Sequence, residues 1–237
     1  MRDQHYPSFR ESIDVVREKL TLLTQKAASP EERSFYHELI DYFERVEALP
    51  HPVRLKEKLR ENEVFPAKHQ KIAVVEMVTN RSILLADEMG GGKTGSCISM
   101  FEHFRDEGEA SRALIMCPAQ VVPVWRKALS DRPDGYFKPG HAPRAVFIES
   151  ENKDWLEAKE AEYVVVGIEM SRSSSDGVSH EDKIKALGAD FFAVDEVHNV
   201  KNPNGSDAER IFHISQESSL LSGYLCLSSG TPVPNTV

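Results

Sequence analysis

The 237-residue sequence has no apolar run long enough to cross a bilayer, and it opens on a polar stretch without an apolar signal core. We therefore expect a cytoplasmic protein, nuclear in a eukaryote, with no membrane partner. Cysteine is scarce as well, because only Cys97, Cys117 and Cys226 are present. Their odd number and their spacing match no zinc pattern. Buried, unpaired thiols in a reducing compartment are the expected consequence.

An excess of positive charge is also missing. The sequence contains 29 Lys and Arg residues against 38 Asp and Glu residues, for a formal net charge of −9. A dedicated duplex-binding module is usually basic. The composition therefore excludes a broad electrostatic footprint on DNA from this chain alone, and any nucleic-acid contact is expected to be local or shared with another domain.

Two amphipathic helices are predicted in the first fifty residues. Apolar residues recur at helical spacing from Phe9 to Ala27 and again from Phe35 to Leu49. Between them, Ser29-Pro30-Glu31-Glu32 supplies a serine cap, a proline at the first helical position and a capping-box glutamate. The short break predicts an antiparallel hairpin docked on the main domain. A partner-binding or DNA-gripping role for this hairpin stays open.

Short apolar strands alternate with amphipathic helices after a linker at 50–66, which holds a predicted charged helix from Arg54 to Asn62. This alternation predicts a doubly wound α/β domain with a mostly parallel sheet covered on both faces. We place the domain boundary between residues 1–62 and 63–237. The serine-rich segment Ser171–His180 is predicted to be a mobile, solvated loop. The expected strands are Ile83–Ala86, Ala113–Cys117, Ala145–Ile148, Tyr163–Ile168, Phe191–Val194 and Tyr224–Leu227. The expected helices are Thr94–Asp106, Val121–Leu129, Asp154–Glu162, Glu181–Leu187 and Asp207–Ser215.

The strongest local motif is Gly90-Gly91-Gly92-Lys93-Thr94, between a predicted strand and a predicted helix. Glycines let backbone N–H groups approach a phosphate, and a helix N-terminus favours an anion. Lys93 then reaches the β- and γ-phosphates of ATP, and the Thr94 hydroxyl ligates Mg²⁺. The general pattern has a glycine where this sequence has Asp87. The predicted nucleotide-binding set also includes the flanking residues Met89 and Gly95.

A second motif, Asp195-Glu196-Val197-His198, follows the apolar strand Phe191–Val194. At a strand tip near the phosphates, Asp195 can hold Mg²⁺. Glu196 can orient and deprotonate the attacking water. A solvated turn is the commoner explanation of an isolated Asp-Glu pair, but its position about one hundred residues after a phosphate loop favours catalysis. For His198, a structural bond to a neighbouring loop is nearly as good an interpretation.

Five segments resemble, in order, the motifs of Swi/Snf-type ATPases in helicase superfamily two. The family's Asp-Glu-Met-Gly start accounts for Asp87, whereas Gly91 stands where most members have leucine and Ser229 where most have threonine. The segments are Phe65–Gln70 (the glutamine motif), Leu85–Thr94 (motif I), Leu114–Pro118 followed by Trp125 (motif Ia), Asp195–Asn202 (motif II) and Ser229–Asn235 (motif III).

The resemblance implies a RecA-like P-loop domain that uses ATP and Mg²⁺, with Gln70 reading the adenine edge. It places three residues, Pro118, Ala119 and Gln120, near the nucleic-acid backbone. Weaker candidates for the same face are Lys201 and Asn202. Ser229 and Thr231 are implied to couple the two sites, although a polar turn also explains them. Trp125 shares an apolar helical face with its neighbours, so we expect it in the core.

The family's second RecA-like domain, which carries an arginine finger and the other half of the DNA track, is absent from this sequence. We therefore expect the ATP-binding half of a DNA translocase that remodels complexes on duplex DNA and is nearly inactive by itself. A DNA or RNA helicase of a neighbouring branch is the first alternative. The second is a nucleotide-dependent interaction module that acts through the N-terminal helices, whose protein partners the sequence does not indicate.

Overall fold

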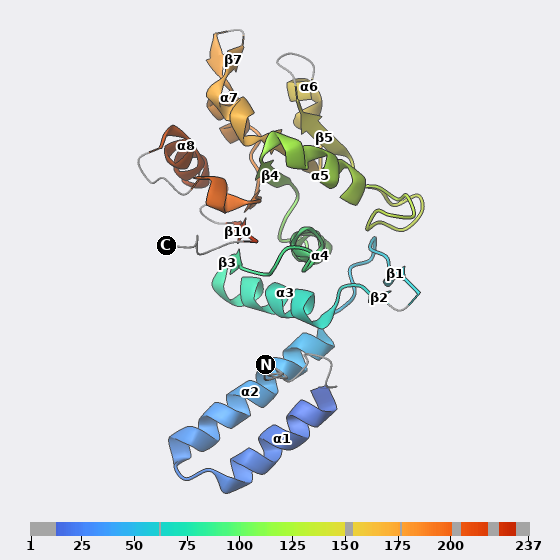
Figure 1. Ribbon diagram of the computed structural model, residues 1–237, viewed down its shortest axis with the longest axis vertical. Coiled ribbons are helices and arrows are strands. Elements are labelled where there is room, and N and C mark those ends of the chain that lie inside the picture. The colour runs from blue at the N-terminus through green and yellow to red at the C-terminus, as the bar shows by residue number, and fades with distance from the viewer. Residues whose placement is uncertain are drawn as a thin grey trace, which may run out of the picture.

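A computed structural model describes residues 13–61, 63–149, 154–175, 177–200, 205–217 and 223–230. It shows a helical hairpin at one end of the molecule and an α/β domain at the other (Figure 1). Among the described residues, every helix is too short or too polar to span a bilayer.

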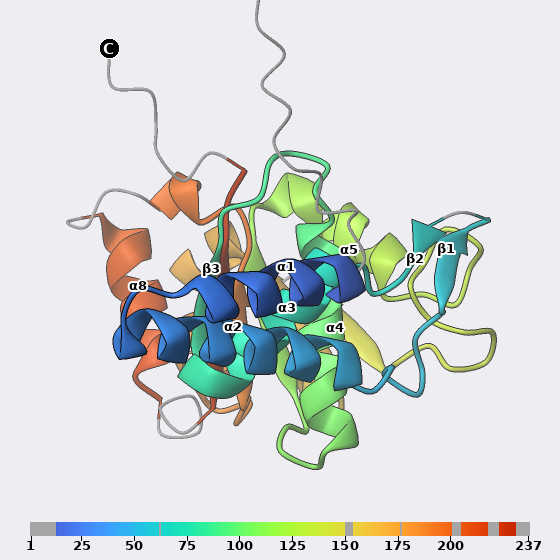
Figure 2. The same cartoon turned by 90° about the horizontal axis from the view of Figure 1, so that it is seen from below.

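The N-terminal hairpin consists of helix α1 (Ile13–Lys26) and helix α2 (Pro30–Ala48), which pack side by side (Figure 2). The predicted cap is confirmed, because the Glu32 N–H donates to Ser29 Oγ at 3.1 Å. The Glu32 carboxylate in turn accepts from the Ala28 N–H at 2.7 Å. These bonds satisfy backbone donors that the start of a helix leaves free.

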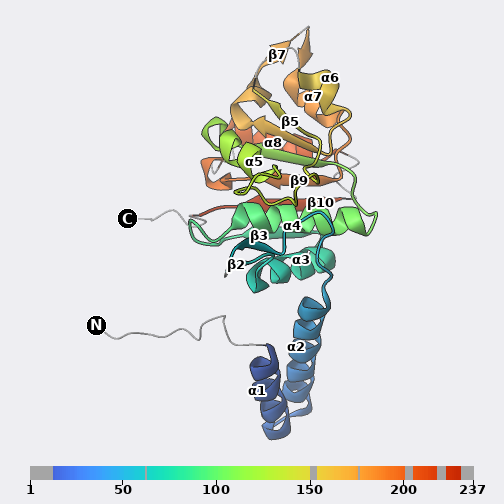
Figure 3. The same ribbon diagram turned by 90° about the vertical axis from the view of Figure 1, so that its right-hand side faces the viewer.

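The hairpin packs on the α/β domain near the C-terminal end of α2. Val46 of α2 is buried against Val75 of helix α3 (Lys68–Asn80), with Tyr42 beside them. The rest of the hairpin projects away from the sheet (Figure 3). Phe35, which lies near the far end, is consequently 55% exposed. The predicted docking is therefore restricted to one helix end.

The predicted charged helix from Arg54 to Asn62 is wrong. Leu55 is fully buried and forms an antiparallel bridge with Phe137. Strand β1 (Lys58–Arg60) then pairs antiparallel with strand β2 (Glu63–Val64). Contacts distant in sequence override the local helix propensity here. Residue 62 lies outside the described residues, and the domain boundary at 62/63 stays a prediction.

The central sheet has six parallel strands in the order β3-β10-β9-β4-β6-β5. This confirms the predicted α/β class, and each predicted strand is matched to within about one residue. The strands are β3 (Ser82–Leu85), β4 (Ala113–Cys117), β5 (Ala145–Ile148), β6 (Tyr163–Gly167), β9 (Phe191–Val194) and β10 (Tyr224–Ser228).

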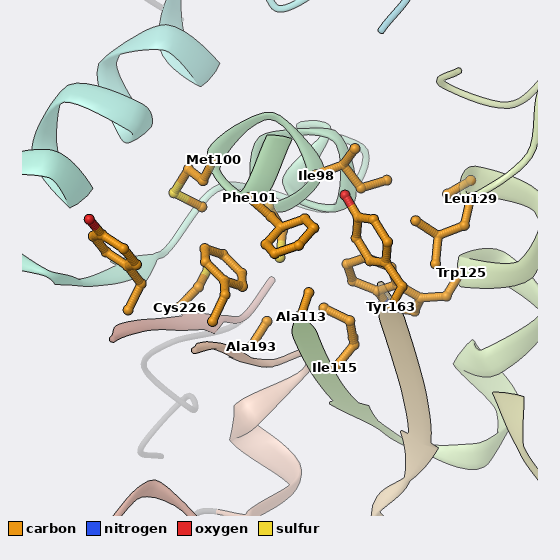
Figure 4. Close-up of a cluster of buried hydrophobic side chains, with 14 of the residues drawn as sticks. Ile98, Met100, Phe101, Ala113, Ile115, Trp125, Leu129, Tyr163, Ala193 and Cys226 are labelled. Atoms are coloured by element: carbon orange, nitrogen blue, oxygen red, sulfur yellow. The ribbon is translucent and has the colours of Figure 1, made fainter. Parts of the chain in front are cut away.

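Both faces of the sheet are covered, as the uniformly apolar strands require. One core packs α3, α4 (Lys93–Asp106) and α5 (Val122–Ala128) on alternate strand residues such as Ala113 and Ile115 (Figure 4). The opposite core packs α6 (Asp154–Ala158), α7 (His180–Lys185) and α8 (Ser206–Ser215) on the intervening residues, such as Leu114 and Met116. All three cysteines are buried and free, as expected.

The segment Ser171–His180 is not a simple solvated loop. It begins within the 3₁₀ helix η2 (Ile168–Arg172) and continues as a small antiparallel pair, β7 (Ser174–Ser175) with β8 (Val178–Ser179). Ser171 and His180 are both buried. The prediction fails at these two residues because each side chain forms a hydrogen bond with a backbone carbonyl. Ser171 bonds to the carbonyl of Ile168, and His180 bonds to that of Met170.

Candidate nucleotide site

Four of the predicted motifs meet at one edge of the sheet. Strands β3, β10, β9 and β4 are consecutive neighbours and all parallel, so their carboxyl ends lie together. The residues that follow these ends are the glycine loop, Ser229-Gly230, Asp195-Glu196 and Pro118-Ala119-Gln120. Ligands of open α/β sheets bind in the crevice beyond this edge.

A cavity of about 400 Å³ opens at this edge, a size typical of small-ligand sites. Each of the four motifs contributes to its wall. The lining residues are Met89, Pro118, Gln120, Val121, Glu196, His198, Asn199 and Gly230. The structure thus brings the predicted catalytic glutamate together with two predicted nucleic-acid residues.

The glycine loop has the backbone of a phosphate cradle. Gly90 and Gly92 have φ values of 84° and 80°, in the left-handed region that glycine adopts without strain, and Gly92 caps helix α4. Lys93 Nζ folds back over the loop and donates to the carbonyls of Asp87 at 2.9 Å and Glu88 at 3.1 Å. The ammonium group therefore lies at the loop, where a bound phosphate would attract it.

Two further glycines are required by close approach. A Cβ on Gly91 would lie 3.0 Å from the Glu88 carbonyl oxygen, so this loop conformation leaves little room for the leucine of most family members. A Cβ on Gly95 would lie 2.9 Å from Gln70 Nε2 and 3.0 Å from the Phe65 ring. The absent side chain of Gly95 lets the glutamine motif reach the loop.

Gln70 lies beside the loop, but both ends of its amide already have backbone partners. Its Oε1 accepts from the Ala67 N–H at 2.8 Å, and its Nε2 donates to the Gly92 carbonyl at 3.1 Å. The adjacent His69 places Nε2 3.0 Å from the Gly91 carbonyl oxygen. Gln70 therefore braces the phosphate loop, and the adenine contact stays a prediction. Sequence reasoning missed His69.

Asp195 is 6% exposed and held by donors from several elements. Oδ1 accepts from Ser228 Oγ at 2.6 Å and from the Glu196 N–H at 3.0 Å. Oδ2 accepts from Trp125 Nε1 at 3.0 Å. Trp125 is buried, as expected, but its N–H contact was missed. The signal was present in principle, since a buried indole N–H usually needs a partner.

Glu196 lines the cavity, and one of its carboxylate oxygens, Oε2, is buried. Its backbone is strained, with φ 53°, as is common at functional positions. Among the described residues, no group donates a hydrogen bond to the buried Oε2. His198 Nδ1 lies 3.1 Å from this oxygen without hydrogen-bond alignment, and 3.1 Å from Ser229 Oγ, with which it pairs. A water molecule is a fitting partner for Oε2.

The end of β10 rests on the glycine loop. The Ser229 N–H donates to the Leu85 carbonyl at 3.0 Å. A Cβ on Gly230 would lie 2.9 Å from Met89 Cγ and 3.6 Å from Lys93 Nζ, so Gly230 packs directly against the side chains of the loop. Together with the His198–Ser229 contact, this joins Ser229 and Gly230 both to the segment that carries the glycine loop and to the motif after β9.

The remaining predicted residues differ in how far the structure describes them. Thr94 is the second residue of α4 and half-buried. Ala119 and Gln120 begin the 3₁₀ helix η1 (Ala119–Val121) and are exposed. Glu169 Oε2, which sequence reasoning missed, accepts from the Ala119 N–H at 3.1 Å. Three predicted residues lie outside the described residues: Lys201, Asn202 and Thr231.

The residues present fit ATP with Mg²⁺. The loop offers backbone N–H groups and one ammonium, and Glu196 offers an unpartnered oxygen. Within the described residues, no three His, Cys, Asp or Glu side chains gather as a protein-only metal site. A site of one carboxylate and one hydroxyl suits Mg²⁺, which takes most of its ligands from phosphates and water.

Comparison with known proteins agrees with this arrangement. The family model of the SNF2-related domain matches residues 23–237. A curated relative, the "Uncharacterized ATP-dependent helicase YqhH" of Bacillus subtilis (strain 168), is 26% identical over 175 residues, which are 73% of this chain and 27% of that protein.

Two solved structures from Sulfolobus solfataricus share the fold. The SWI2/SNF2 ATPase core in complex with dsDNA has a TM-score of 0.58 at 25% identity, over 78% of this chain and 34% of that one. The ATPase core domain alone has a TM-score of 0.55 at 26% identity, with the same coverage. The chain spans only 27–34% of the length of these three relatives. Since the family model covers most of its length, the chain belongs to the SNF2-related domain family.

Proposed function

We propose that this chain is the ATP-binding half of an ATP-dependent DNA translocase of the Swi/Snf type. The observation that carries the proposal is the cavity at the carboxyl edge of the sheet. Met89, which directly precedes the glycine loop, lines this cavity together with Glu196 and with Gln120 of the exposed segment that follows β4.

The chemistry proposed is hydrolysis of the γ-phosphate of ATP. Lys93 Nζ leaves the neutral Asp87 and Glu88 carbonyls and binds the negatively charged β- and γ-phosphates, so that both donor and acceptor carry a charge. Glu196 Oε2 orients the attacking water and accepts its proton. Thr94 and Asp195 hold Mg²⁺, which when bound neutralises charge on the phosphates.

The proposed nucleic-acid contact lies on the same edge. Ala119 and Gln120 are exposed, and Gln120 shares the cavity with Glu196. Duplex DNA is the proposed partner because the solved relative in complex with dsDNA has the same fold at 25% identity. A strand-separating helicase is the second candidate, because the Bacillus relative is named as an ATP-dependent helicase.

The proposal includes dependence on a second RecA-like domain. This chain spans 34% of the solved ATPase cores, and its net charge of −9 offers phosphate no broad attraction. An arginine finger from a second domain contributes roughly 10³–10⁵ in turnover at related phosphoryl-transfer sites. The chain by itself is therefore expected to bind ATP, hydrolyse it slowly and respond little to DNA.

Phosphate release by the 237-residue chain, with and without duplex DNA, tests this proposal. Slow turnover that DNA leaves unchanged, together with tight ATP binding, is expected. Robust DNA-stimulated turnover by the chain alone would refute the half-motor proposal. For a motor that includes a second RecA-like domain, displacement of a third strand from a triplex without separation of the duplex would favour translocation over strand separation.

A further inference from the structure

The carboxylate of Asp195 has a donor that lies outside the loops of the nucleotide site. Trp125 Nε1, from the middle of helix α5, donates to Oδ2 at 3.0 Å across 70 residues of sequence. Ser228 holds the other oxygen at 2.6 Å. Because each oxygen is held by a different element, the orientation of the carboxylate depends on where α5 lies relative to β10.

The Trp125 ring has little freedom to move. It is 1% exposed and lies in the core with Leu129 and Tyr163 (Figure 4). An indole N–H is a donor only, and a hydrogen bond to a carboxylate is stronger than one to a neutral acceptor. The contact therefore holds Asp195 with a donor that the core itself keeps in place.

The second tryptophan provides a contrast within the same chain. Trp155, on α6, is 9% exposed and packs near His180, in the core on the opposite face of the sheet. Its Nε1 is buried, and among the described residues it has no hydrogen-bond partner. Among the described residues, a buried indole N–H therefore occurs without an acceptor at Trp155 and with a carboxylate acceptor at Trp125.

We propose that Trp125 is a positioning residue that holds the Asp195 carboxylate in the orientation required for the magnesium–nucleotide site. This inference rests on the proposed role of Asp195 in that site. It has a second consequence, because α5 continues directly from η1, which carries the exposed Ala119 and Gln120. A shift of that segment on binding nucleic acid would move the donor of Asp195, and metal binding would act on the segment in return.

The test compares the same substitution, tryptophan to phenylalanine, at two buried positions. Trp125→Phe keeps an aromatic ring in the core and removes the N–H that donates to Asp195, whereas Trp155→Phe removes one that donates to no described group. Loss of such an outer partner of a metal ligand typically weakens metal affinity about 10- to 100-fold. We expect Trp125→Phe to raise the Mg²⁺ concentration for half-maximal binding of a non-hydrolysable ATP analogue by that factor. Trp155→Phe should leave it unchanged.

A spectroscopic measurement keeps the test decisive if Trp125→Phe does not fold. In Trp155→Phe, Trp125 is the only tryptophan, because the sequence contains two. Its fluorescence should change when Mg²⁺ is added to the analogue-bound chain, and Asp195→Ala should abolish that change. A merely structural tryptophan would not respond to the metal in this way.

The outcomes separate this inference from the proposed function. If the parent chain binds the analogue with Mg²⁺, but both Trp→Phe variants keep the parental Mg²⁺ dependence, the positioning role is refuted and the ATP site stands. The role is equally refuted if the fluorescence of Trp125 does not change when Mg²⁺ is added. If the parent chain itself binds no Mg²⁺–analogue complex, the proposed function fails, and the inference fails with it.

Discussion

Glu102 of helix α4 is a buried carboxylate whose removal should destabilise the fold strongly. Its side chain is fully buried and accepts from both Arg54 Nε, at 3.0 Å, and Arg54 Nη2, at 2.8 Å. Tyr163 Oη donates to it at 2.8 Å, and Arg105 Nε at 3.1 Å. Burial opposes the charged form of Arg54, yet the bonds and charges of Glu102 and Glu162 outweigh it and raise the pKa of the guanidinium.

Glu102→Gln preserves the shape of the side chain and deletes the charge that the network is built around. Breaking a buried ion pair from one side typically destabilises a protein by about 3–5 kcal/mol. We expect a value toward the lower end, because Glu162 still accepts from Arg54 at 2.7 Å. For a chain of this size, that corresponds to a melting temperature lower by roughly 6–12 °C.

Glu149→Gln is the matched control. Glu149 forms an ion pair of 2.6 Å with Arg126, but both side chains are about half exposed, at 51% and 50%. Exposed pairs contribute about 0–1 kcal/mol. Denaturant titration of both variants, followed by circular dichroism, compares the free energies of unfolding. Equal destabilisation by the two substitutions would show that the buried network does not carry the stability assigned to it.

Three further predictions concern the nucleotide site. Lys93→Ala should weaken binding of an ATP analogue with Mg²⁺ by about 1.5–3 kcal/mol in titration calorimetry without changing thermal stability; unchanged affinity would remove the phosphate-loop assignment. Glu196→Gln should retain nucleotide and Mg²⁺ binding but suppress hydrolysis in a complete motor. Asp195→Asn should mainly weaken the Mg²⁺ dependence of binding. Identical behaviour of these two variants would contradict the division of roles. Gly230→Ala should leave the affinity for nucleotide nearly unchanged in calorimetry, because its Cβ would meet Met89 Cγ at 2.9 Å and the 82% exposed Met89 side chain can turn aside, while the 3.6 Å distance to Lys93 Nζ is an ordinary contact; a large loss of affinity would show that the loop cannot adjust.

Local patterns in the sequence determined the strands of the central sheet, most of the helices and the order of the motifs. Uniformly apolar runs such as Phe191–Val194 are buried on both faces of a parallel sheet, and the Ser29 cap begins α2 as its spacing predicts. The glycine loop was predictable for the same reason, since the strand before it, the glycines and the helix after it are contiguous. Parallel strands then place the loops after β3, β9 and β10 at one edge, whatever the details of packing.

Only the tertiary structure decided which side chains complete the site and where long-range contacts override local helix propensity. The segment from Arg54 onward has a helical composition. However, the Arg54 guanidinium pairs with Glu102, 48 residues away, and the backbone of Leu55 pairs with that of Phe137. The helical face of Trp125 was predictable from spacing, whereas its partner Asp195 lies 70 residues away, directly after strand β9. Hydrogen bonds between segments far apart in the chain have no periodic signature, because they depend on strand order and helix position, which exist only after folding.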